Sequence, residues 1–241
     1  METNPNGPYP GRQLFLGLTT GGQPAFAYLV TGRNPQSRER KAVRVGDGIR
    51  IGPLGQVEYD PLRHYTAVKV DELSGIVAVS NGIQTDAIFE AYRLLFNTDS
   101  APARGYMKKL LDGARAEPDS YHTPRIAGII TYRRTTAEPV LIVGIKTYGI
   151  SAGTFRVKLE PGELTGVSTY QGEMEAPRAF DIDAELPVLR SEANTAEDLA
   201  EYLFDISAAS YNGDDIRVCA IGGICSVEGT WNLHIINRHQ D

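Results

Sequence analysis

The clearest hydrophobic pattern of the chain lies in residues 75–97. Residues 75–79 are small or β-branched, which predicts a buried strand. After a sharp turn at residues 80–82, apolar positions follow the spacing of one helical face, which predicts an amphipathic helix. These positions are Ile83, Ala87, Ile88, Ala91, Leu94 and Leu95.

The same kind of pattern predicts further strands and two more helices. One helix covers residues 104–116, and the other opens with cap residues at 194–197 and is expected to close at Gly213. The predicted strands are 12–18, 24–30, 43–45, 49–51, 66–70, 126–131, 140–147, 155–159, 164–169, 216–221, 224–227 and 231–236.

This order of elements predicts the fold class. Strands follow one another with short turns between them, so the sheets should be largely antiparallel. Two sheets stacked face to face with helices outside them give an α+β fold, a four-layer α-β-β-α sandwich, as one domain over residues 1–241. Residues 1–8 are expected to be a loose tail. Residues 172–191, acidic and proline-bearing, are expected to be a long surface excursion.

Composition limits the kinds of partner. The chain of 241 residues is 41% hydrophobic and carries a formal net charge of −6. These values fit a globular domain with its own core, whereas a general nucleic-acid binder needs clustered cations. A small phosphorylated ligand held by a few arginines is compatible with this charge.

Cysteine usage and the N-terminal sequence favour the cytoplasm. Cys219 and Cys225 are too few for a disulfide framework and have no partners at metal-ligand spacing, so buried thiols are expected. The N-terminus has no signal-peptide core, and no apolar run reaches membrane-spanning length. No membrane partner is predicted.

Several familiar catalytic motifs are absent from the sequence. There is no Gly-x-x-x-x-Gly-Lys-Ser/Thr phosphate loop, no Gly-x-Gly-x-x-Gly motif and no Gly-x-Ser-x-Gly elbow. The histidines are scattered, so neither a zinc site nor a Ser-His-Asp triad is expected. They are His64, His122, His234 and His239.

The turn at Ser80, Asn81 and Gly82 has two interpretations. A strand-to-helix turn directs free backbone N–H groups at one point, which suits an anion or a developing oxyanion, with Thr85 and Asp86 close by. Ser and Asn are also ordinary helix caps, and Asp86 would complement the helix dipole. The turn alone leaves both interpretations open.

Arginine, tyrosine and carboxylate positions near strand ends supply the other candidates. Arg33 and Arg38 lie in a polar loop after a strand, and the guanidinium fork suits phosphate. Arg40 and Lys41 of the same loop are expected to be solvated. Residues 117–125 precede a strand and offer carboxylates, a phenol, hydroxyls and a guanidinium.

Together these segments resemble one family. Val79-Ser80-Asn81-Gly82-Ile83-Gln84-Thr85-Asp86 resembles its Val-Ser-Asn-Gly-x-x-Thr-Asp signature, and Thr123-Pro124-Arg125-Ile126-Ala127 resembles its Thr-Pro-Arg-Ile-Ala signature. Gly11-Arg12, residues 24–28, 168–170 and 229–233 are also similar. The family is that of the archaeal-type (PurO-type) IMP cyclohydrolases.

The resemblance implies a fold and an activity. The fold would be like that of the N-terminal-nucleophile hydrolases, without their self-cleavage. The activity would be closure of 5-formamidoimidazole-4-carboxamide ribonucleotide (FAICAR) to inosine monophosphate (IMP) with loss of water, in purine biosynthesis. This is a hydrolase acting on a cyclic amidine C–N bond, run in the synthetic direction, and it needs no metal or cofactor. The partner would be a purine nucleotide, and a homo-oligomer is left open.

The resemblance also implies roles for single residues. Arg33 and Arg38 would bind the 5′-phosphate, Arg125 the carboxamide or the oxyanion, and Tyr170 would stack on the imidazole. The candidates for proton transfer, left unranked, are Tyr65, Asp86, Glu117 and Tyr121. The other substrate contacts would be Arg12, Ser80, Asn81, Gly82, Thr85 and Thr123, with Asn81 or the backbone near Gly82 facing the formyl oxygen or the base edge.

The chain also departs from the family pattern. Leu29 stands where the family has arginine, and Gly32 and Asn34 stand where it has serines. A changed substrate or a nucleotide-binding relative without catalysis is therefore an alternative. A further alternative, an amide hydrolase on the same sandwich, would need a nucleophilic Cys, Ser or Thr at a mature N-terminus.

Overall fold

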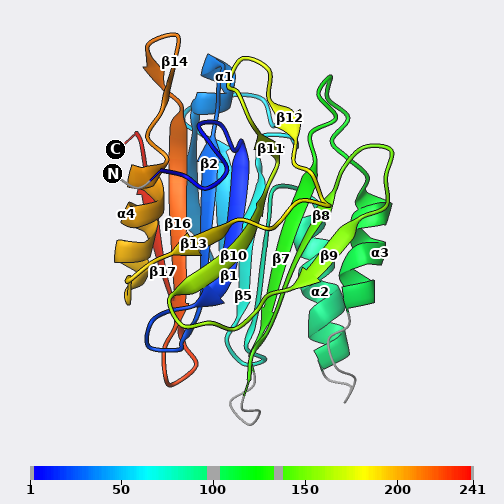
Figure 1. Ribbon diagram of the computed structural model, residues 1–241, viewed down its shortest axis with the longest axis vertical. Helices are drawn as coiled ribbons and strands as arrows, with labels where there is room; N and C mark the ends of the chain where they lie inside the picture. Colours follow the sequence, from blue (N-terminus) through cyan, green and yellow to red (C-terminus); the bar gives the residue numbers. More distant parts are fainter. Residues whose placement is uncertain (1–2, 97–103, 133–137, 240–241) are drawn as a thin grey trace.

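Two large antiparallel sheets form the centre of the molecule (Figure 1). The computed structural model describes residues 3–96, 104–132 and 138–239. The first sheet, in the order β13-β10-β1-β2-β16-β17, contains β1 (Arg12–Leu18), β2 (Pro24–Thr31), β10 (Glu163–Ser168), β13 (Val188–Arg190), β16 (Arg217–Cys225) and β17 (Trp231–Asn237). The second sheet, in sequence order, contains β3 (Arg40–Val45), β4 (Gly48–Pro53), β5 (Tyr65–Asp71), β6 (Ile76–Ser80), β7 (Arg125–Thr131), β8 (Val140–Lys146) and β9 (Gly153–Arg156).

Helices and short ribbons surround the sheets. The helices are α1 (Pro35–Arg38), α2 (Gln84–Phe96), α3 (Arg104–Ala114) and α4 (Ala196–Ile206). The two ribbons pair β11 (Tyr170–Gln171) with β12 (Arg178–Ala179), and β14 (Ser210–Tyr211) with β15 (Asp214–Asp215).

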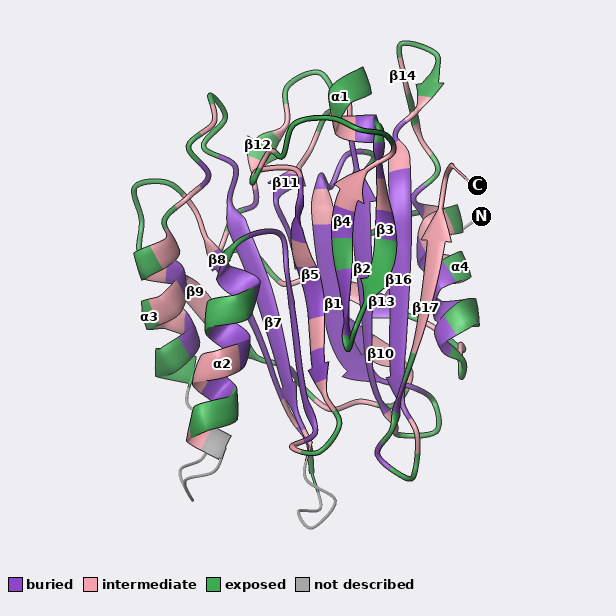
Figure 2. Ribbon diagram, turned by 180° about the vertical axis from the view of Figure 1, so that it is seen from behind, coloured by how far each residue is buried: buried purple, intermediate pink, exposed green. Residues whose placement is uncertain are grey.

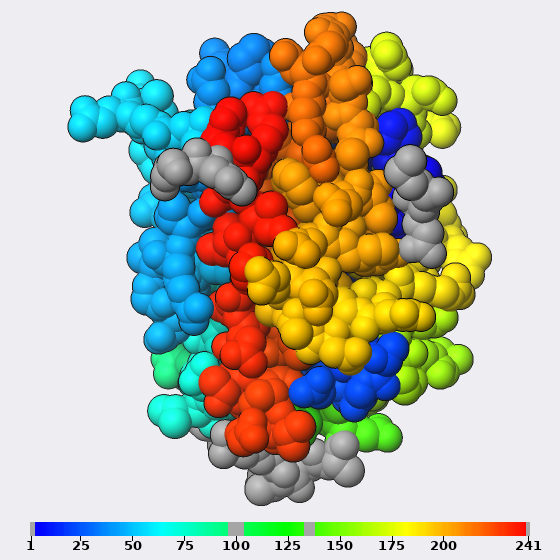
Figure 3. Space-filling view, turned by 90° about the vertical axis from the view of Figure 1, so that its left-hand side faces the viewer, coloured from blue at the N-terminus to red at the C-terminus, as the bar shows by residue number. Residues whose placement is uncertain are grey.

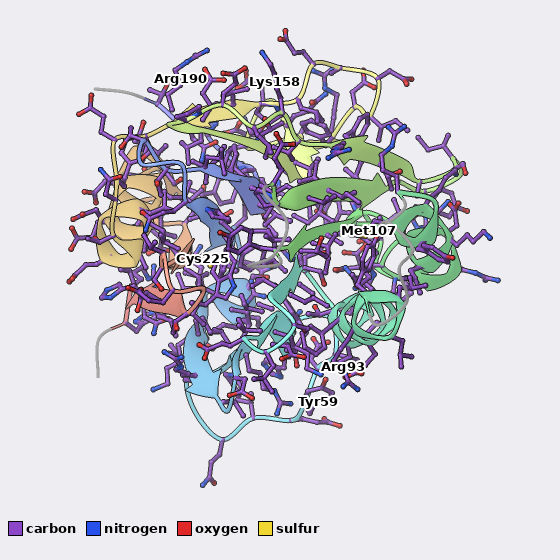
Figure 4. All side chains as sticks on the ribbon, turned by 90° about the horizontal axis from the view of Figure 1, so that it is seen from below. Tyr59, Arg93, Met107, Lys158, Arg190 and Cys225 are labelled. Carbon is purple, nitrogen blue, oxygen red and sulfur yellow. The ribbon has the colours of Figure 1, made fainter. Side chains whose placement is uncertain are left out.

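The layers follow the order helix, sheet, sheet, helix. Figure 1 shows α4 on one outer side and α2 with α3 on the other. The largest apolar cluster lies between the sheets and joins Leu14 of the first to Val79 of the second. Met107 of α3, labelled in Figure 4, belongs to a second cluster between the second sheet and the helices α2 and α3. Leu199 and Leu203 of α4 belong to a third cluster, against the first sheet. This arrangement of two antiparallel sheets with outer helices agrees with the predicted sandwich.

The central strands are buried on both faces, as Figure 2 shows by their colour. Every residue of β2 and of β7 is buried. A strand between a helix layer and a second sheet faces apolar groups on both sides, so its sequence is almost continuously hydrophobic. This is why residues such as Ile129 and Ile130, which point to opposite faces, are both apolar.

The last helix is shorter than predicted. α4 begins as expected, with the Thr195 side chain accepting a hydrogen bond from the Asp198 backbone, but it ends at Ile206. Asn212 and Gly213, both with positive φ, instead form the two-residue turn between β14 and β15. Asn-Gly is the preferred sequence for such a turn, so Gly213 marks a hairpin and not a helix end.

The predicted strands 216–221 and 224–227 form one strand, β16. Its two central glycines allow close packing on both faces. A Cβ at Gly222 would lie 2.1 Å from the Ala196 carbonyl oxygen of α4, and one at Gly223 would lie 2.0 Å from the Phe26 ring. The glycines therefore serve packing at this point and do not break the strand.

Two segments expected to lie loosely on the surface are held by the fold. Within residues 172–191, β13 pairs with β10 as the edge of the first sheet. In the N-terminal segment, Asn4 is buried and its backbone N–H donates to the Ile206 carbonyl at 3.1 Å. The tail prediction was therefore wrong for the described part of residues 1–8.

The two sheets also meet along one side of the sandwich. The Asn237 side chain at the end of β17 hydrogen-bonds both the N–H and the carbonyl of Ala42 in β3. Figure 3 shows β17 running beside α4 on this face. Cys219 and Cys225 of the neighbouring β16 are buried, as predicted, and burial raises the pKa of the Cys219 thiol to about 12. In the described ranges, no helix is long and apolar enough to cross a membrane.

Candidate active site

A cavity of about 450 Å³ opens at the end of the molecule where α1, β11 and β14 lie, the top in Figure 1. Loops from both sheets meet there, because the strand ends of a stacked pair share this edge. Its lining is rich in guanidinium, phenol and carboxylate groups. The residues are Tyr9, Arg12, Thr31, Arg33, Asn34, Ser37, Arg40, Asp60, Leu62, Arg63, Glu117, Asp119, Ser120, Tyr121, Thr123, Tyr170 and Tyr211.

Arg12 and Glu117 form the inner part of the cavity. Nη2 of Arg12, at the start of β1, lies 3.0 Å and 3.1 Å from the two carboxylate oxygens of Glu117. The Arg125 guanidinium approaches the same carboxylate at 3.2 Å from the buried side. Glu117 is 2% exposed, so an isolated charge there would be costly and the two arginines compensate it.

Burial and charge act in opposite directions on this group. Burial raises the pKa of Glu117, while the charges of Arg12 and Arg125 act to lower it. Burial acts to lower the pKa of the Arg12 guanidinium, but Glu117 and nearby phenols raise it well above its ordinary value. Arg12 therefore stays a cation, and Glu117 is a carboxylate whose proton affinity depends on what enters the cavity.

Arg40 is the main residue that the sequence prediction missed. It was expected to be solvated, but it is 3% exposed and lies in the cavity wall. Its side chain donates to the backbone carbonyls of Ser37 and Arg63, and no described carboxylate forms an ion pair with it. Burial lowers the pKa of Arg40, and the nearby Arg12 acts in the same direction. The strand alternation of Arg40 with the buried Ala42 is the signal that could have placed it inward.

Arg33 lines the cavity between two tyrosine rings. Its guanidinium carbon is 5.0 Å from the centre of the Tyr9 ring and 5.4 Å from that of Tyr121. Nη1 donates to the Met174 carbonyl at 2.7 Å, which fixes the plane of the fork. Because no described carboxylate forms an ion pair with Arg33, its charge is available to an anionic ligand.

Arg38, predicted beside Arg33, supports the cavity from behind. Its Nη1 donates to the Arg33 carbonyl at 2.5 Å, and its Nη2 pairs with Asp214 at 2.5 Å. Arg38 is buried and is not part of the lining. Arg38 can therefore act on a ligand only through Arg33.

Three polar groups form a hydrogen-bond chain along the wall. The Thr123 hydroxyl donates to the Asp119 carboxylate at 2.5 Å and lies 2.5 Å from the Tyr170 hydroxyl. Since the Thr123 proton is used toward Asp119, Tyr170 is the donor in the second bond. Burial raises the pKa of Tyr170 to about 12, so its phenol keeps its proton at neutral pH.

The turn at residues 80–82 does not line the cavity. Asn81 is 0% exposed; its amide donates to the Pro124 carbonyl at 2.9 Å and accepts from the Ile126 N–H at 2.9 Å. The Ser80 and Thr85 hydroxyls lie 2.5 Å apart and are also 0% exposed. A Cβ at Gly82 would lie 2.2 Å from Nη1 of Arg125, so glycine leaves the space that this guanidinium occupies.

Tyr65 and Asp86 also lie outside the lining. Tyr65 is 2% exposed, and its hydroxyl is 2.8 Å from that of Tyr28 in the core. The Asp86 side chain is 59% exposed and pairs with Lys69 at 3.0 Å. Of the four proton-transfer candidates, the structure therefore brings only Glu117 and Tyr121 to the cavity wall.

The cavity is suited to an anionic, planar ligand. Arg12, Arg33, Arg40 and Arg63 line it, with Glu117, Asp60 and Asp119 as the carboxylates. Within the described part of the chain, no group of three or more His, Cys, Asp or Glu side chains could hold a metal ion. Guanidinium groups suit phosphate, and the tyrosines offer flat apolar surface to a ring.

Comparison with known proteins assigns the family. The family model of IMP cyclohydrolase-like proteins matches residues 9–228. The IMP cyclohydrolase of Methanococcus maripaludis strain C5 is 31% identical over 200 residues, which are 82% of this chain and 88% of the relative. That of Haloarcula marismortui is 31% identical over 235 residues, 95% of this chain and 98% of the relative.

A third relative matches over a shorter region. The IMP cyclohydrolase of Thermococcus kodakarensis is 37% identical over 125 residues, which are 52% of this chain and 57% of that relative. The family match and the two long alignments together cover most of the chain. The chain belongs to the IMP cyclohydrolase-like family.

Proposed function

We propose that this protein is an IMP cyclohydrolase, which closes FAICAR to IMP with loss of water. The strongest support comes from Arg40, a buried cation in the cavity wall that is hydrogen-bonded to carbonyls and has no described carboxylate as ion-pair partner. A bound phosphate would supply the missing negative charge. The family match and the relatives' names support the same reaction.

Arg33, Arg40 and Arg63 are the proposed phosphate ligands. All three line the cavity, and Arg33 is held in place by the Tyr9 and Tyr121 rings. Arg38, which the sequence placed in this role, fixes the Arg33 backbone instead. The imidazole ring would lie deeper, toward Arg12 and Tyr170.

Glu117 is the proposed base. The carboxamide nitrogen must lose a proton as it attacks the formyl carbon, and a buried carboxylate with a raised pKa is a stronger base than an exposed one. Arg12, on the cavity side of Glu117, would stabilise the negative charge that develops on the formyl oxygen. Arg125 holds Glu117 from behind and acts as a positioning residue.

Tyr170 is the proposed acid. The proton that Glu117 has taken up can return to the oxyanion, which gives a ring carbinolamine. Loss of water then removes the hydroxyl group and the proton on the former formamido nitrogen. The Tyr170 phenol, protonated at neutral pH, can turn its proton from Thr123 to the departing hydroxyl, and the phenolate so formed takes the proton from the former formamido nitrogen. The ring closure is intramolecular, so holding the two groups together supplies much of the rate acceleration.

We extend the proposal to the fold family and the enzyme class of the protein. The helix-sheet-sheet-helix order supports a fold like that of the N-terminal-nucleophile hydrolases. The enzyme would be a hydrolase of a cyclic amidine C–N bond, run in the synthetic direction. Its partner would be a purine nucleotide.

The test is turnover of FAICAR by the purified protein, followed by chromatography of IMP, in buffer containing EDTA. Arg40→Met should raise KM at least about tenfold, because a hydrogen bond to a charged group contributes about 1.5–3 kcal/mol. Arg190→Met, at an exposed arginine of β13, is the matched control and should leave KM unchanged. IMP binding without turnover by the unaltered protein would instead indicate a nucleotide-binding relative.

A further inference from the structure

The N-terminal segment, residues 3–9, reaches the cavity wall through its last residue, Tyr9, and the rest of the segment precedes the family match. That match begins at Tyr9, whereas Asn4 and Asn6 precede it. Tyr9 is 7% exposed and belongs to the cavity lining. It packs in a small apolar cluster with Tyr170, Met174 and Ile216. Neither the motifs nor the charge pattern of the sequence pointed to this segment.

Asn4 fixes the segment to the body of the protein. Its side-chain Nδ2 donates to Gln13 Oε1 at 2.7 Å and to Ser207 Oγ at 2.8 Å, and Gln13 Nε2 returns a bond to Asn4 Oδ1 at 3.0 Å. Asn4 Oδ1 also accepts the Asn6 N–H at 3.0 Å. Gln13 is 0% exposed and directly follows Arg12 in β1. One buried side chain thus joins the segment to β1 and to the end of α4.

Tyr9 contacts two residues of the proposed site. Its ring stacks on Tyr170 with centroids 5.7 Å apart and an interplanar angle of 15°. On Arg33, the guanidinium carbon lies 5.0 Å from the Tyr9 centroid. Tyr170 is also held by its hydrogen bond to Thr123, so the Tyr9 ring matters chiefly for the proposed phosphate ligand Arg33.

We propose that Tyr9 is a positioning residue for the nucleotide phosphate, and that Asn4 acts through Tyr9 by holding the N-terminal segment in place. The inference rests on the proposed function, because the ligand is the nucleotide of that reaction. Tyr9 pre-orders Arg33, so substrate does not have to order that side chain on binding. Loss of the ring weakens nucleotide binding and leaves the chemical step nearly intact.

The experiment compares Tyr9→Leu, Tyr9→Phe, Asn4→Ala and the control Asn6→Ala. The side-chain Nδ2 of Asn6 has no hydrogen-bond partner among the described residues, so its removal should change little. We expect Tyr9→Leu to raise KM for FAICAR and Kd for IMP by about five- to thirtyfold, with kcat within about twofold. Tyr9→Phe keeps the stack and should match the unaltered protein.

A double variant tests whether Asn4 acts through Tyr9. Asn4→Ala should raise KM in the same direction, and Tyr9→Leu/Asn4→Ala should show the effect of Tyr9→Leu alone, because residues in one chain of contacts are not additive. Kinetics are measured well below each variant's Tm, so lost stability by itself does not raise KM. Additive effects, or a lowered Tm with unchanged KM and Kd, would overturn the proposal.

The outcomes separate this inference from the proposed function. If the unaltered protein turns over FAICAR but Tyr9→Leu has unchanged KM and Kd, the positioning role fails and the function stands. If the unaltered protein binds IMP without turnover, the function fails, and the ratio of Kd values still supports or overturns the role of Tyr9. If it neither binds IMP nor turns over FAICAR, both are overturned.

Discussion

The turn at residues 80–85 and the loop at residues 117–125 both carry polar side chains, but they use them differently. In the turn, Ser80, Asn81 and Thr85 are fully buried and bonded to other protein groups. In the loop, Glu117 and Thr123 are also buried, yet both line the cavity. What separates the two regions is access, because a polar side chain that is bonded to other protein groups can still meet a ligand where it lines the cavity.

Hydrogen bonds join the two regions, and the side chains of the turn hold the loop in place. Asn81 binds the Pro124 carbonyl and the Ile126 N–H, and its Nδ2 lies 3.5 Å from Glu117 Oε1. Gly82 leaves room for the guanidinium of Arg125. The turn therefore positions the loop and Arg125, and the loop supplies side chains that line the cavity.

Glu117→Gln should have the largest effect, since it removes the charge that the loop presents to the cavity. Arg12 and Arg125 would be left buried without their carboxylate, and breaking a buried ion pair costs about 3–5 kcal/mol. If Glu117 is the base, turnover also falls about a thousandfold or more. Denaturant unfolding and initial rates measure the two effects separately.

Glu185→Gln is the control for this substitution, because Glu185 is an exposed carboxylate that does not line the cavity. It should change neither stability nor turnover. A Glu117→Gln protein with full activity would exclude Glu117 as the base.

Asn81→Ala should affect stability more than chemistry, which sharpens the contrast between turn and loop. It leaves the Pro124 carbonyl and the Ile126 N–H without their partner in a buried place, at a cost of about 2–3 kcal/mol in the free energy of unfolding. At a temperature where the variant is folded, KM should stay within a few fold. A rise in KM as large as that of Arg40→Met, with unchanged stability, would show that Asn81 contacts the substrate.

The strands and their antiparallel order could be predicted because almost every buried strand reads as a short apolar run between turns. The predictions were wrong where a glycine could end a helix or strand, form a hairpin turn or allow close packing. Gly213 belongs to a hairpin, and Gly222 lies inside a strand, because packing and turn geometry decide between these roles. The pair Asn212-Gly213 is a local signal for a hairpin, whereas the close packing at Gly222 is not visible in a local pattern.

Part of the candidate site could be predicted, namely the residues of the 117–125 loop that line the cavity, together with Arg12, Arg33 and Tyr170. Arg40 and Tyr9 were missed because their roles depend on which way a strand faces and on what packs over a terminal segment. The polar turn was assigned to ligand because sequence shows the available donors but not the partners that already occupy them.

On the free energy of unfolding, Tyr170→Phe should have a smaller effect than the substitutions above, seen at alkaline pH; its loss of turnover, as the proposed acid, is a separate effect. The pKa of Tyr170 is about 12 in the folded protein, against 10.0 for an ordinary tyrosine. A pKa raised by folding contributes stability that is present below pH 10.0 and is lost as the pH rises toward about 12. The stability advantage of the unaltered protein over Tyr170→Phe should therefore shrink by about 2 kcal/mol between these values.

Urea unfolding followed by the fluorescence of the buried Trp231 measures this difference at each pH. Other buried tyrosines with a raised pKa, Tyr28 and Tyr92, titrate in both proteins, so they cancel in the comparison. A constant difference across the range would place the Tyr170 hydroxyl in contact with solvent.

Asp86→Asn should have the smallest effect, although Asp86 belongs to the motif that resembles the family signature. Its exposed carboxylate pairs with Lys69 on the outer side of α2 and complements the helix dipole, which together contribute less than about 1 kcal/mol. Thr85→Val provides the contrast one residue earlier: it removes a buried hydroxyl that donates to the Thr66 carbonyl at 2.6 Å, at a cost of about 1–2 kcal/mol. Both variants are assayed for unfolding and for FAICAR turnover. A large loss of kcat in Asp86→Asn would show that the turn takes part in catalysis. Unchanged kcat beside destabilised Thr85→Val would establish it as a scaffold.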